Sequence, residues 1–442
     1  MSNKQAEFHL VQSVIGRHLF VTNGSRLYDI DYDGAFTLDD LEGIIEDLSS
    51  TATRWIDAEP IAPPPLQTLS LNVAQACNMG CGYCYADKGK FKGKARVMSI
   101  EVARSAVDRL IAESRVGADL VIGFMGGEPF LNRRLLHEIM PYAEMAAAAR
   151  GHKIRFSLTT NATLLEPQDV RLLADHNVQV AISIDGPKSI NDSVRSLNNG
   201  GSAYAQLLHS LDLFERKGWP RHLSARITVT PAARDLPRIL DHVLSLGFDS
   251  AGFAAVLVSP DIRYTFSKDD FKWFLSGMVA CGEKAKNAIL SHDCYPFSNF
   301  ETALYEIHRG SHRPYPCGAG AAYLSVNADG EMFTCHRLID DPTHRMGTVW
   351  DGSDVAARAR HLAARHVDRQ EPCRSCWARY LCGGGCYHEI DRRGRLGCDY
   401  IRGWLDYCLS TYAEIRETSP DYFDGHSDYF STFAAQGIDA PK

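Results

Sequence analysis

The sequence predicts an α/β protein built around a partial (β/α)6 TIM barrel, with a small α+β module before the barrel and a cysteine-rich domain after it. Three observations predict this fold class. Strand-like and helix-like segments alternate six times from residue 66 to about residue 256, which implies a parallel sheet with right-handed crossovers. Six repeats are too few to close an eight-stranded barrel, so an open one is expected. The cysteines gather in two blocks, one after the first strand and one near the C-terminus.

The composition is that of an ordinary soluble protein. The 442 residues are 45% apolar and 23% charged, enough for two or three domains with a large core. A formal net charge of −7 gives no indication of a nucleic-acid partner. No apolar run is long enough to span a bilayer and the first residues lack a signal-peptide core, so a cytoplasmic protein without a membrane partner is expected. In that compartment the thirteen cysteines are expected to be metal ligands rather than disulfides.

Residues 1–65 are predicted to form a small module that ends in a proline-rich linker at 60–65. Three short strands are expected at residues 7–13, 17–22 and 26–31. A helix capped by Thr37 follows, with Leu38, Leu41, Ile45 and Leu48 as its apolar stripe. The module resembles the leader-binding units of peptide-modifying enzymes, which take up a substrate leader as an added strand. A plain N-terminal extension that packs on the main domain is an equally good interpretation.

The barrel domain is predicted over residues 66–300. Its six strands are expected at residues 69–73, 120–125, 154–160, 178–184, 223–229 and 251–256. The helices between them are expected at residues 99–113, 133–150, 166–175, 202–217 and 233–246. In such a barrel the functional residues stand on the loops at the carboxyl ends of the strands, so we searched these loops first.

The loop after the first strand contains Cys77, Cys81 and Cys84, separated by three residues and then by two. One turn of loop can point all three sulfurs at a single metal cluster. Four-iron clusters normally take four thiolates, so three leave one iron open for another ligand. Gly80 and Gly82 allow tight bends between the cysteines. A zinc knuckle or a group of buried thiols is the alternative, although zinc usually takes four ligands in two pairs.

This pattern, with Tyr83 just before the last cysteine, resembles the radical S-adenosylmethionine (radical SAM) superfamily, and the resemblance implies that Tyr83 contacts the cofactor. The resemblance implies that the open iron chelates the amino and carboxylate groups of S-adenosylmethionine. It also implies that reductive cleavage of this cofactor gives a 5′-deoxyadenosyl radical, which takes a hydrogen atom from the substrate. An external electron donor of the flavodoxin or ferredoxin type is then expected as a partner.

Gly126, Gly127 and Glu128 follow the second strand and are followed by Pro129. This sequence resembles the Gly-Gly-Glu-Pro motif of the same superfamily. The resemblance implies that the glycines let the backbone approach the methionine moiety, and that backbone carbonyls and Glu128 take up its ammonium group. Alone, such a tetrapeptide is a common strand-to-helix turn, and its position after the second strand is what makes it informative.

Further cofactor contacts are expected after the next strands. Asn161 follows the third strand, Ser183 ends the fourth, and Arg195 comes shortly afterwards. The resemblance implies polar contacts to the ribose from this region and a cation for the methionine carboxylate. Asp185 is alternatively explained as a residue that stabilises its own turn. Arg226, inside the fifth strand, either lines the cavity or forms an ion pair within the barrel.

A C-terminal domain is predicted over residues 301–420, followed by a tail at 421–442. Cys317 and Cys335 bracket a hairpin pattern that turns at Asp329-Gly330. Five further cysteines follow at positions 373, 376, 382, 386 and 398, namely Cys373, Cys376, Cys382, Cys386 and Cys398. A structural zinc site would account for four of the seven cysteines and leave three unexplained.

The series resembles the SPASM extension of radical SAM enzymes, which carries two auxiliary clusters, so three [4Fe-4S] clusters are implied in total. The resemblance assigns Cys317, Cys335 and Cys386 to the first auxiliary cluster. It assigns Cys373, Cys376, Cys382 and Cys398 to the second. The fourth position of the first cluster is filled by Cys294 or Cys281, or is open to a substrate thiolate. Cys408 is expected to be a buried structural cysteine.

The predicted function is that of a radical SAM oxidoreductase that matures a peptide or a small protein subunit. Residues 312–320 and 397–400 resemble thioether-forming maturases, such as the family that crosslinks the small subunit of quinohemoprotein amine dehydrogenase. These enzymes join a cysteine sulfur to the methylene carbon of an Asp or Glu side chain. A carbon–carbon crosslinking maturase is the first alternative. A formylglycine-forming sulfatase maturase is less expected, because His336 stands where those enzymes carry aspartate. An Fe–S electron carrier is the non-enzymatic alternative, and no catalytic residue is assigned.

Overall fold

The computed structural model describes residues 7–30, 43–45, 48, 59–91 and 93–424. Backbone contacts divide the chain into two compact units. The barrel unit consists of Ala62–Phe266 and Gly318–Arg360. The terminal unit consists of Met1–Ile61, Ser267–Cys317 and His361–Lys442. The domain limits expected at residues 65, 300 and 420 stay predictions.

Six parallel strands form the centre of the barrel unit, as the sequence predicts. They are β4 (Thr68–Gln75), β6 (Asp119–Gly126), β7 (Lys153–Thr160), β8 (Gln179–Ser183), β9 (His222–Val229) and β10 (Ser250–Ala255). They pair in the order β10-β9-β8-β7-β6-β4, and each neighbouring pair is parallel. The predicted α/β class with a partial barrel is therefore confirmed.

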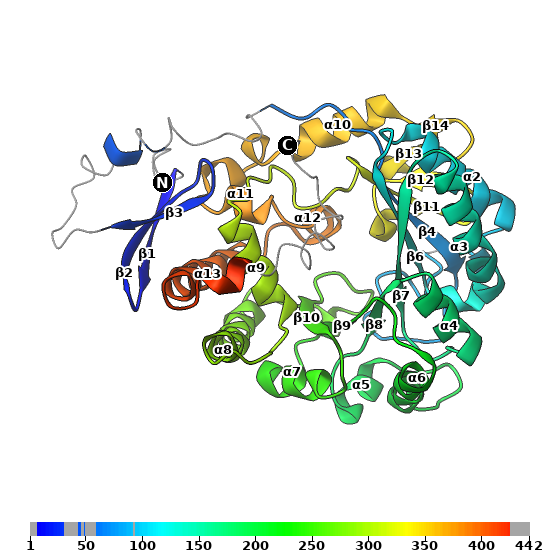
Figure 1. Cartoon of the computed structure of the whole chain (residues 1–442), viewed down its shortest axis with the longest axis horizontal. Coiled ribbons are helices and arrows are strands. Elements are labelled where there is room, and N and C mark those ends of the chain that lie inside the picture. Colours follow the sequence, from blue (N-terminus) through cyan, green and yellow to red (C-terminus); the bar gives the residue numbers. More distant parts are fainter. Residues whose placement is uncertain (1–6, 31–42, 46–47, 49–58, 92, 425–442) are drawn as a thin grey trace. The chain divides into compact units, whose positions relative to one another are not determined.

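Helices follow these strands and cover the outer face of the sheet (Figure 1). They are α2 (Ile100–Glu113), α3 (Arg133–Ala148), α4 (Pro167–Asp175), α5 (Lys188–Val194), α6 (Ala203–Lys217) and α7 (Leu236–Leu244). Helix α2 begins where the sequence predicts, because the Ser99 side chain accepts a hydrogen bond from the Val102 N–H at 3.3 Å. Short 3-10 turns stand at Pro129–Asn132, Ile262–Tyr264, His336–Leu338 and Pro342–His344.

The two faces of the barrel sheet differ in polarity. On β9 the buried Leu223, Ala225 and Ile227 alternate with the more accessible Ser224 and Arg226. Side chains of a strand alternate between the two faces, so the apolar series packs under the helices and the polar series faces the barrel interior. Strand β9 therefore contributes polar side chains to the barrel interior.

The predicted hairpin joins the barrel sheet, which the sequence pattern did not indicate. Strand β11 (Tyr323–Val326) is antiparallel to β12 (Glu331–Phe333), and it is also parallel to β4, with Leu324 opposite Leu69. Strands β13 (Arg345–Thr348) and β14 (Gly352–Ser353) extend the sheet, and β5 (Arg96–Val97) pairs with β4. A residue that follows β11 closely is thereby brought near the cysteine loop that follows β4.

The terminal unit combines an antiparallel sheet with helices. The sheet consists of β1 (Phe8–Ser13), β2 (Gly16–Val21) and β3 (Arg26–Ile30), in that order. The helices are α8 (Asp270–Leu290), α9 (Ser298–His308), α11 (Arg379–Cys382), α12 (Tyr387–Arg393), α13 (Cys398–Thr418) and α14 (Asp421–Asp424), and 3-10 turns stand at Val367–Arg369 and Cys373–Ser375. In the sequence, the boundary between Arg360 and His361 falls within helix α10 (Val355–Arg365). No helix in the described parts of the chain is long and apolar enough to cross a membrane.

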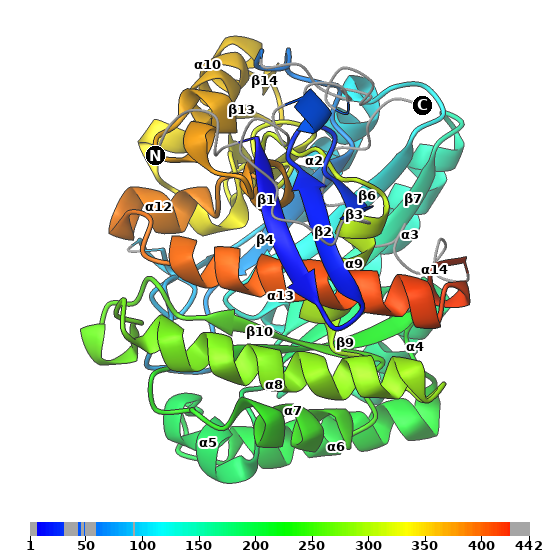
Figure 2. The same cartoon turned by 90° about the vertical axis from the view of Figure 1, so that its left-hand side faces the viewer.

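The N-terminal sheet packs against α13, over which β1 and β2 cross in Figure 2. The His9 ring stacks on Trp377 with centroids 4.0 Å apart, and His9 Nε2 lies 2.6 Å from a carboxylate oxygen of Asp406. Arg416 donates to Asp29 at 2.6 Å. The three predicted strands are thus present, and they pack as a module that is continuous with the C-terminal region.

The helix expected after these strands falls largely outside the described residues. This applies to its cap, Thr37, and to Leu38 and Leu41. Ile45 is described and buried, and it packs in a small apolar cluster with Leu19 and Val21.

Candidate metal and cofactor site

The cysteine loop is anchored by backbone hydrogen bonds to the segment that follows α5. The Gly80 N–H donates to the Ser196 carbonyl at 2.8 Å, and the Gly82 N–H donates to the Val194 carbonyl at 3.0 Å. At Gly82 an added Cβ would lie 2.5 Å from the ring of Tyr264, so this position accepts only glycine without a shift of the tyrosine. The fold itself therefore holds the backbone that carries the three cysteines.

The three thiols of this loop lie in one buried neighbourhood. Burial raises the pKa of the Cys77 thiol to about 12, and the negative charges of Glu128, Cys81 and Cys84 raise it further. Burial also raises the pKa of Cys81, which the positive charge of Arg195 opposes. Such thiols release their protons when a metal binds. In the described parts of the chain no three His, Cys, Asp or Glu side chains converge on one ion. A cluster that offers each sulfur its own iron fits this donor set better than zinc does.

Glu128 is fully buried and already has three protein donors. Its carboxylate accepts from the Phe130 N–H at 3.1 Å, from the Thr160 hydroxyl at 2.8 Å and from the Asn161 N–H at 2.8 Å. Burial raises the pKa of Glu128, and these three hydrogen bonds oppose the rise. The carboxylate thus joins the loops after β6 and β7. A contact between Glu128 and the ammonium group of the cofactor stays a prediction.

Asn161 connects Glu128 to the cysteine loop. Its side-chain amide donates to Asn78 Oδ1 at 3.0 Å and to Cys77 Sγ at 3.8 Å. Asn161, which Glu128 holds in place, thereby orients Cys77, a predicted cluster ligand. The sequence placed Asn161 at the correct strand end but gave no indication of this contact.

Gly126 and Gly127 are required by the close approach of two parts of the protein. Gly126 has φ +154°, and an added Cβ would lie 2.3 Å from the Ala74 carbonyl oxygen. At Gly127 an added Cβ would lie 2.2 Å from the carbonyl oxygen of Ala76. The chain approached here is the start of the cysteine loop. The glycines therefore bring the β6 loop against the cysteine loop, and an approach to the methionine moiety stays a prediction.

Tyr83, Asp185 and Arg195 meet beside the cysteine loop. The Tyr83 hydroxyl donates to Asp185 Oδ2 at 2.6 Å and accepts from Arg195 Nη1 at 2.6 Å. Ser183 ends β8, where it stands opposite Arg226 of β9 in the sheet register. Ser183 and Asp185 lie at the carboxyl end of β8, and Tyr83 lies on the loop after β4, as expected for the functional end of the barrel.

Tyr85 and Arg337 form a contact that sequence reasoning missed. The Arg337 guanidinium lies over the Tyr85 ring, 5.3 Å from its centroid. Burial raises the pKa of Tyr85 to about 12, with smaller effects from Cys84 and Cys335 on either side. Cys335, a predicted ligand of the first auxiliary cluster, thus lies near the cysteine loop within the barrel unit. The only signal in the sequence was that Tyr85 directly follows Cys84 and that Arg337 stands two residues after Cys335.

The terminal unit brings four cysteines together. Burial raises the pKa of Cys373 to about 11, and charges on Cys382, Cys398 and Cys376 raise it further. The Gly384 N–H donates to the sulfur of Cys382. These are the four cysteines predicted for the second auxiliary cluster, and they lie near one another, as the ligands of one cluster would. Their binding of a cluster stays a prediction.

The remaining cysteines are divided between the two units. In the terminal unit Cys317 and Cys386 both lie near the Tyr387 ring, whose pKa they help to raise after burial. Their grouping with Cys335 of the barrel unit stays a prediction. Cys281 and Cys408 are buried on α8 and α13, and Cys294 is exposed. The described contacts bring none of these last three cysteines to a predicted cluster.

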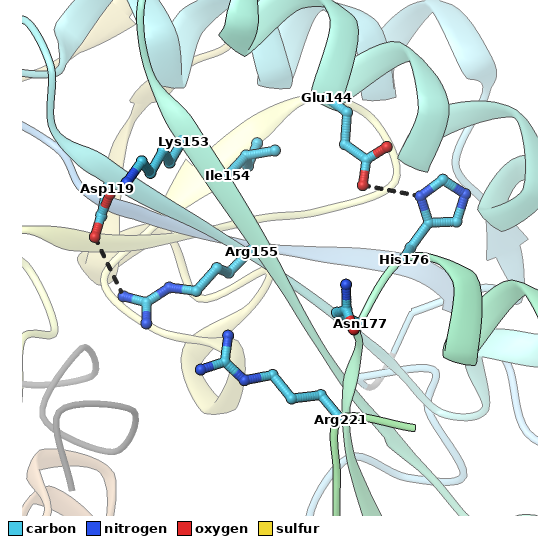
Figure 3. Close-up of a pocket in the computed structure, with 8 residues that line it drawn as sticks. All are labelled: Asp119, Glu144, Lys153, Ile154, Arg155, His176, Asn177 and Arg221. Atoms are coloured by element: carbon cyan, nitrogen blue, oxygen red, sulfur yellow. Dashed lines mark hydrogen bonds and ion pairs between the residues drawn. The ribbon is translucent and has the colours of Figure 1, made fainter. Parts of the chain in front are cut away.

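A separate cavity of about 440 Å³ lies at the amino ends of the barrel strands (Figure 3). Arg155 and Arg221 extend toward it, and Arg155 lies 4.0 Å from Asp119, while His176 pairs with Glu144 at 2.9 Å. No predicted site residue lines this cavity. It is therefore distinct from the cysteine loop, which lies at the carboxyl ends of the strands.

The sequence of the barrel unit matches a known family. Residues 71–251 match the model of the radical SAM superfamily. The matched segment, about two-fifths of the chain, is therefore similar to radical SAM domains. Domains of this kind use S-adenosylmethionine and a [4Fe-4S] cluster, and the loop with Cys77, Cys81 and Cys84 lies within the matched segment. The total of three clusters stays a prediction.

Three curated relatives of this chain are named as sulfatase-maturating enzymes or as a radical SAM synthase. The serine-type anaerobic sulfatase-maturating enzyme of Klebsiella aerogenes is 25% identical over 365 residues, which is 79% of this chain and 87% of that protein. The cysteine-type enzyme of Clostridium perfringens is 23% identical over 370 residues, with 80% and 96% covered. The radical SAM cyclopropyl synthase TigE of Paramaledivibacter caminithermalis is 27% identical, with 74% and 69% covered.

Solved structures share the fold of this chain. The anaerobic enzyme anSMEcpe with bound AdoMet superposes with a TM-score of 0.71 at 20% identity, covering 83% of this chain and 99% of that one. SuiB of Streptococcus suis, bound to its precursor peptide SuiA, superposes with a TM-score of 0.54 at 12% identity, covering 88% and 97%. At these identities the likeness shows the fold alone.

Proposed function

We propose that this protein is a radical SAM maturase that modifies a side chain of a peptide or protein substrate. The observation that carries the proposal is the loop with Cys77, Cys81 and Cys84, packed against Gly126 and Gly127 at the carboxyl end of a partial barrel. An electron carrier needs no such second loop beside its cluster. Relatives that modify sulfatases support a polypeptide as the substrate.

Each residue of the site has a proposed role. Cys77, Cys81 and Cys84 hold the cluster, and Asn161 orients Cys77 through its amide. Ser183 and Arg195 are proposed to contact the bound cofactor. When bound, the cluster and S-adenosylmethionine supply a carbon-centred radical that removes a hydrogen atom from the substrate. The polar interior face of the barrel then receives the substrate side chain.

Three finer chemistries are proposed, and the comparisons favour the first of them. Oxidation of a cysteine or serine side chain, as in sulfatase maturation, is supported by relatives that align with about four-fifths of this chain. Thioether crosslinking was the leading expectation from the sequence, and the comparisons give its specific resemblance no support. It remains the second candidate because His336 stands where the sulfatase enzymes carry aspartate. Carbon–carbon crosslinking is the third.

The cysteines outside the loop are proposed to hold auxiliary clusters. Cys373, Cys376, Cys382 and Cys398 lie close enough to influence one another's ionisation, as ligands of one cluster must. Cys317, Cys335 and Cys386 are proposed for the other. These clusters would accept the surplus electron of an oxidation, and an external donor of the flavodoxin or ferredoxin type would reduce the first cluster.

The test is anaerobic turnover with S-adenosylmethionine and a reductant, followed by mass spectrometry of two co-expressed substrates. One substrate is a sulfatase-derived peptide, and the other is the small polypeptide encoded beside the gene. Loss of sulfur from a cysteine, or loss of two hydrogens from a serine, indicates sulfatase-type oxidation. Loss of two hydrogens together with loss of a thiol that reacts with an alkylating reagent indicates a thioether. Loss of two hydrogens with that thiol retained indicates a carbon–carbon bond. If no 5′-deoxyadenosine is formed, the proposal is overturned, and a non-enzymatic Fe–S electron carrier becomes the better interpretation.

A further inference from the structure

A buried charged triad stands directly beside the cysteine loop. The Tyr83 hydroxyl lies between Asp185 and Arg195, with a hydrogen bond of 2.6 Å to each. Arg195 Nη1 is also 3.8 Å from Asp185 Oδ1, and only 8% and 1% of these two side chains is exposed. Water therefore plays little part in stabilising the charges, and the three side chains depend on one another.

The triad is hydrogen-bonded to strand β9 and to helix α5 of the barrel. Asp185 Oδ1 accepts from the Thr228 N–H on β9 at 3.1 Å. The Asp185 N–H donates to Asn191 Oδ1 on α5 at 3.1 Å, and the Arg195 N–H donates to the Asn191 carbonyl at 2.8 Å. Asp185 therefore does more than stabilise its own turn. It connects the cysteine loop, through Tyr83, to the ends of β8 and β9.

The charge balance of this region points toward the cysteines. A buried guanidinium is costly unless nearby negative charge compensates for it. Asp185 supplies one such charge, and Arg195 also interacts electrostatically with Cys81. A cluster held by three thiolates would place further negative charge there. A reduced cluster carries one more negative charge than the oxidised form, so a neighbouring buried cation favours reduction.

We propose that Tyr83, Asp185 and Arg195 act as a buried clamp that positions the turn from Cys81 to Cys84 and sets the reduction potential of the cluster. Tyr83 and Asp185 are then positioning residues and not contacts of S-adenosylmethionine. Arg195 has the additional role of tuning the cluster electrostatically. This inference rests on the proposed cluster at Cys77, Cys81 and Cys84.

The test is a potentiometric EPR titration of reconstituted holoprotein, without S-adenosylmethionine and without substrate. The signal of this cluster is the one that changes when S-adenosylmethionine is added afterwards to a parallel sample. Arg195→Gln removes a cation and is expected to make the midpoint potential more negative by at least 59 mV, which corresponds to a tenfold change in a one-electron equilibrium. Asp185→Asn removes an anion and is expected to shift the potential in the positive direction. General structural damage would not shift the midpoint potential in opposite directions in these two variants.

Tyr83→Phe tests the positioning role with the removal of a single oxygen atom. The charges stay, but the link between the turn and Asp185 is lost, so the cluster is expected to release its iron to a chelator several-fold faster. Arg195→Lys retains the charge and should keep the potential closer to that of the wild type than Arg195→Gln does. If Arg195→Gln fails to fold, Asp185→Asn and Tyr83→Phe still test the clamp.

Asp108→Asn is the matched control. It makes the same carboxylate-to-amide change on α2, where Asp108 accepts from the Tyr142 hydroxyl at 2.8 Å rather than contacting the cysteine loop. Its potential and iron release should equal those of the wild type. An unchanged potential in Arg195→Gln and Asp185→Asn, with only weaker cofactor binding, would overturn the clamp. A wild-type protein that takes up no cluster would instead contradict the proposed function.

Discussion

The two cysteine-rich regions differ in what holds their sulfurs in place. In the barrel unit, Gly80 and Gly82 bond to the backbone after α5, and the neighbouring Tyr83 is bound to Asp185 and Arg195. In the terminal unit, the cysteines from 373 to 386 stand on or beside a 3-10 turn and short helices, and Cys398 begins the long helix α13. The apolar cluster there consists of Val367, Cys373 and Tyr380.

Ordering the backbone of the terminal region also costs conformational entropy, which a bound cluster would offset. Gly383, Gly384 and Gly385 have φ values of +70°, +94° and +83°, a series that costs conformational entropy on folding. At Gly383 an added Cβ would lie 2.5 Å from the Tyr315 backbone. We infer from this difference that the barrel preorganises its proposed cluster site, and that metal binding at the proposed site of the terminal region would contribute to the folding free energy there.

The largest effect that tests this comparison is expected from Cys382→Ala. Loss of a ligand from the four-cysteine group removes both a cluster and the metal-binding free energy that orders the region. We expect insoluble protein or a thermal transition of the terminal unit lowered by many degrees, measured by circular dichroism and proteolysis. Ser375→Ala, on the same segment, is the control and should behave as the wild type. A soluble Cys382→Ala protein with an unchanged transition would break the comparison.

A smaller structural effect and a complete catalytic effect are expected from Cys81→Ala. The barrel holds the loop without the cluster, so the protein should remain folded and brown from its other clusters. Iron content should fall by about four atoms per chain, and formation of 5′-deoxyadenosine should cease. Iron analysis and anaerobic turnover provide the measurements. Cleavage of S-adenosylmethionine at the wild-type rate would refute the assignment of this loop.

The buried carboxylates of the two units give a third test. Glu128 has three protein donors, whereas Oε2 of Glu301 on α9 is buried with no hydrogen-bond partner among the described residues. Burial raises the pKa of Glu301 from 4.5 to about 7. The folded state therefore retains a proton that the unfolded state releases. This contribution to stability is fully present below pH 4.5 and is lost as the pH rises through 7.

Glu301→Gln should remove this pH dependence. Its advantage over the wild type is expected to grow between pH 5 and pH 8 to on the order of 3 kcal/mol, at 1.36 kcal/mol per pKa unit. Denaturant unfolding at both pH values measures the difference, and Glu417→Gln on the exposed side of α13 is the control. Glu128→Gln should instead destabilise the barrel unit by about 1–3 kcal/mol, because the amide cannot accept from all three donors. Parallel pH profiles of the wild type and Glu301→Gln would contradict the assignment.

The smallest effect is expected from Cys294→Ala. Cys294 is exposed, so its replacement should change stability by less than about 0.5 kcal/mol. If the first auxiliary cluster has an open iron, the variant also keeps its iron content and its modification of substrate. Iron analysis beside turnover tests this. Loss of iron would show that Cys294 closes the cluster, and a substrate thiolate would then have to displace a ligand.

Local patterns in the sequence were sufficient to predict the elements that position the site. The six barrel strands, the Ser99 cap and the N-terminal strands follow from periodicity and capping, which depend on residues near one another in the chain. The spacing of Cys77, Cys81 and Cys84 likewise indicated a cluster loop, because three ligands of one loop need no distant partner. The radical SAM match over residues 71–251 agrees with this interpretation.

Only the tertiary structure decided which distant groups meet. Tyr83 and Asp185 are 102 positions apart, and the parallel pairing of β11 with β4 joins residues more than 250 positions apart. Nothing in the local pattern of a carboxylate states whether its oxygens will meet three donors, as in Glu128, or none, as in Oε2 of Glu301. A buried polar group takes its partners from whatever the folded chain brings within hydrogen-bonding distance. Sequence therefore indicated the candidate ligands of the site, and tertiary packing determined the charges and hydrogen bonds that surround them.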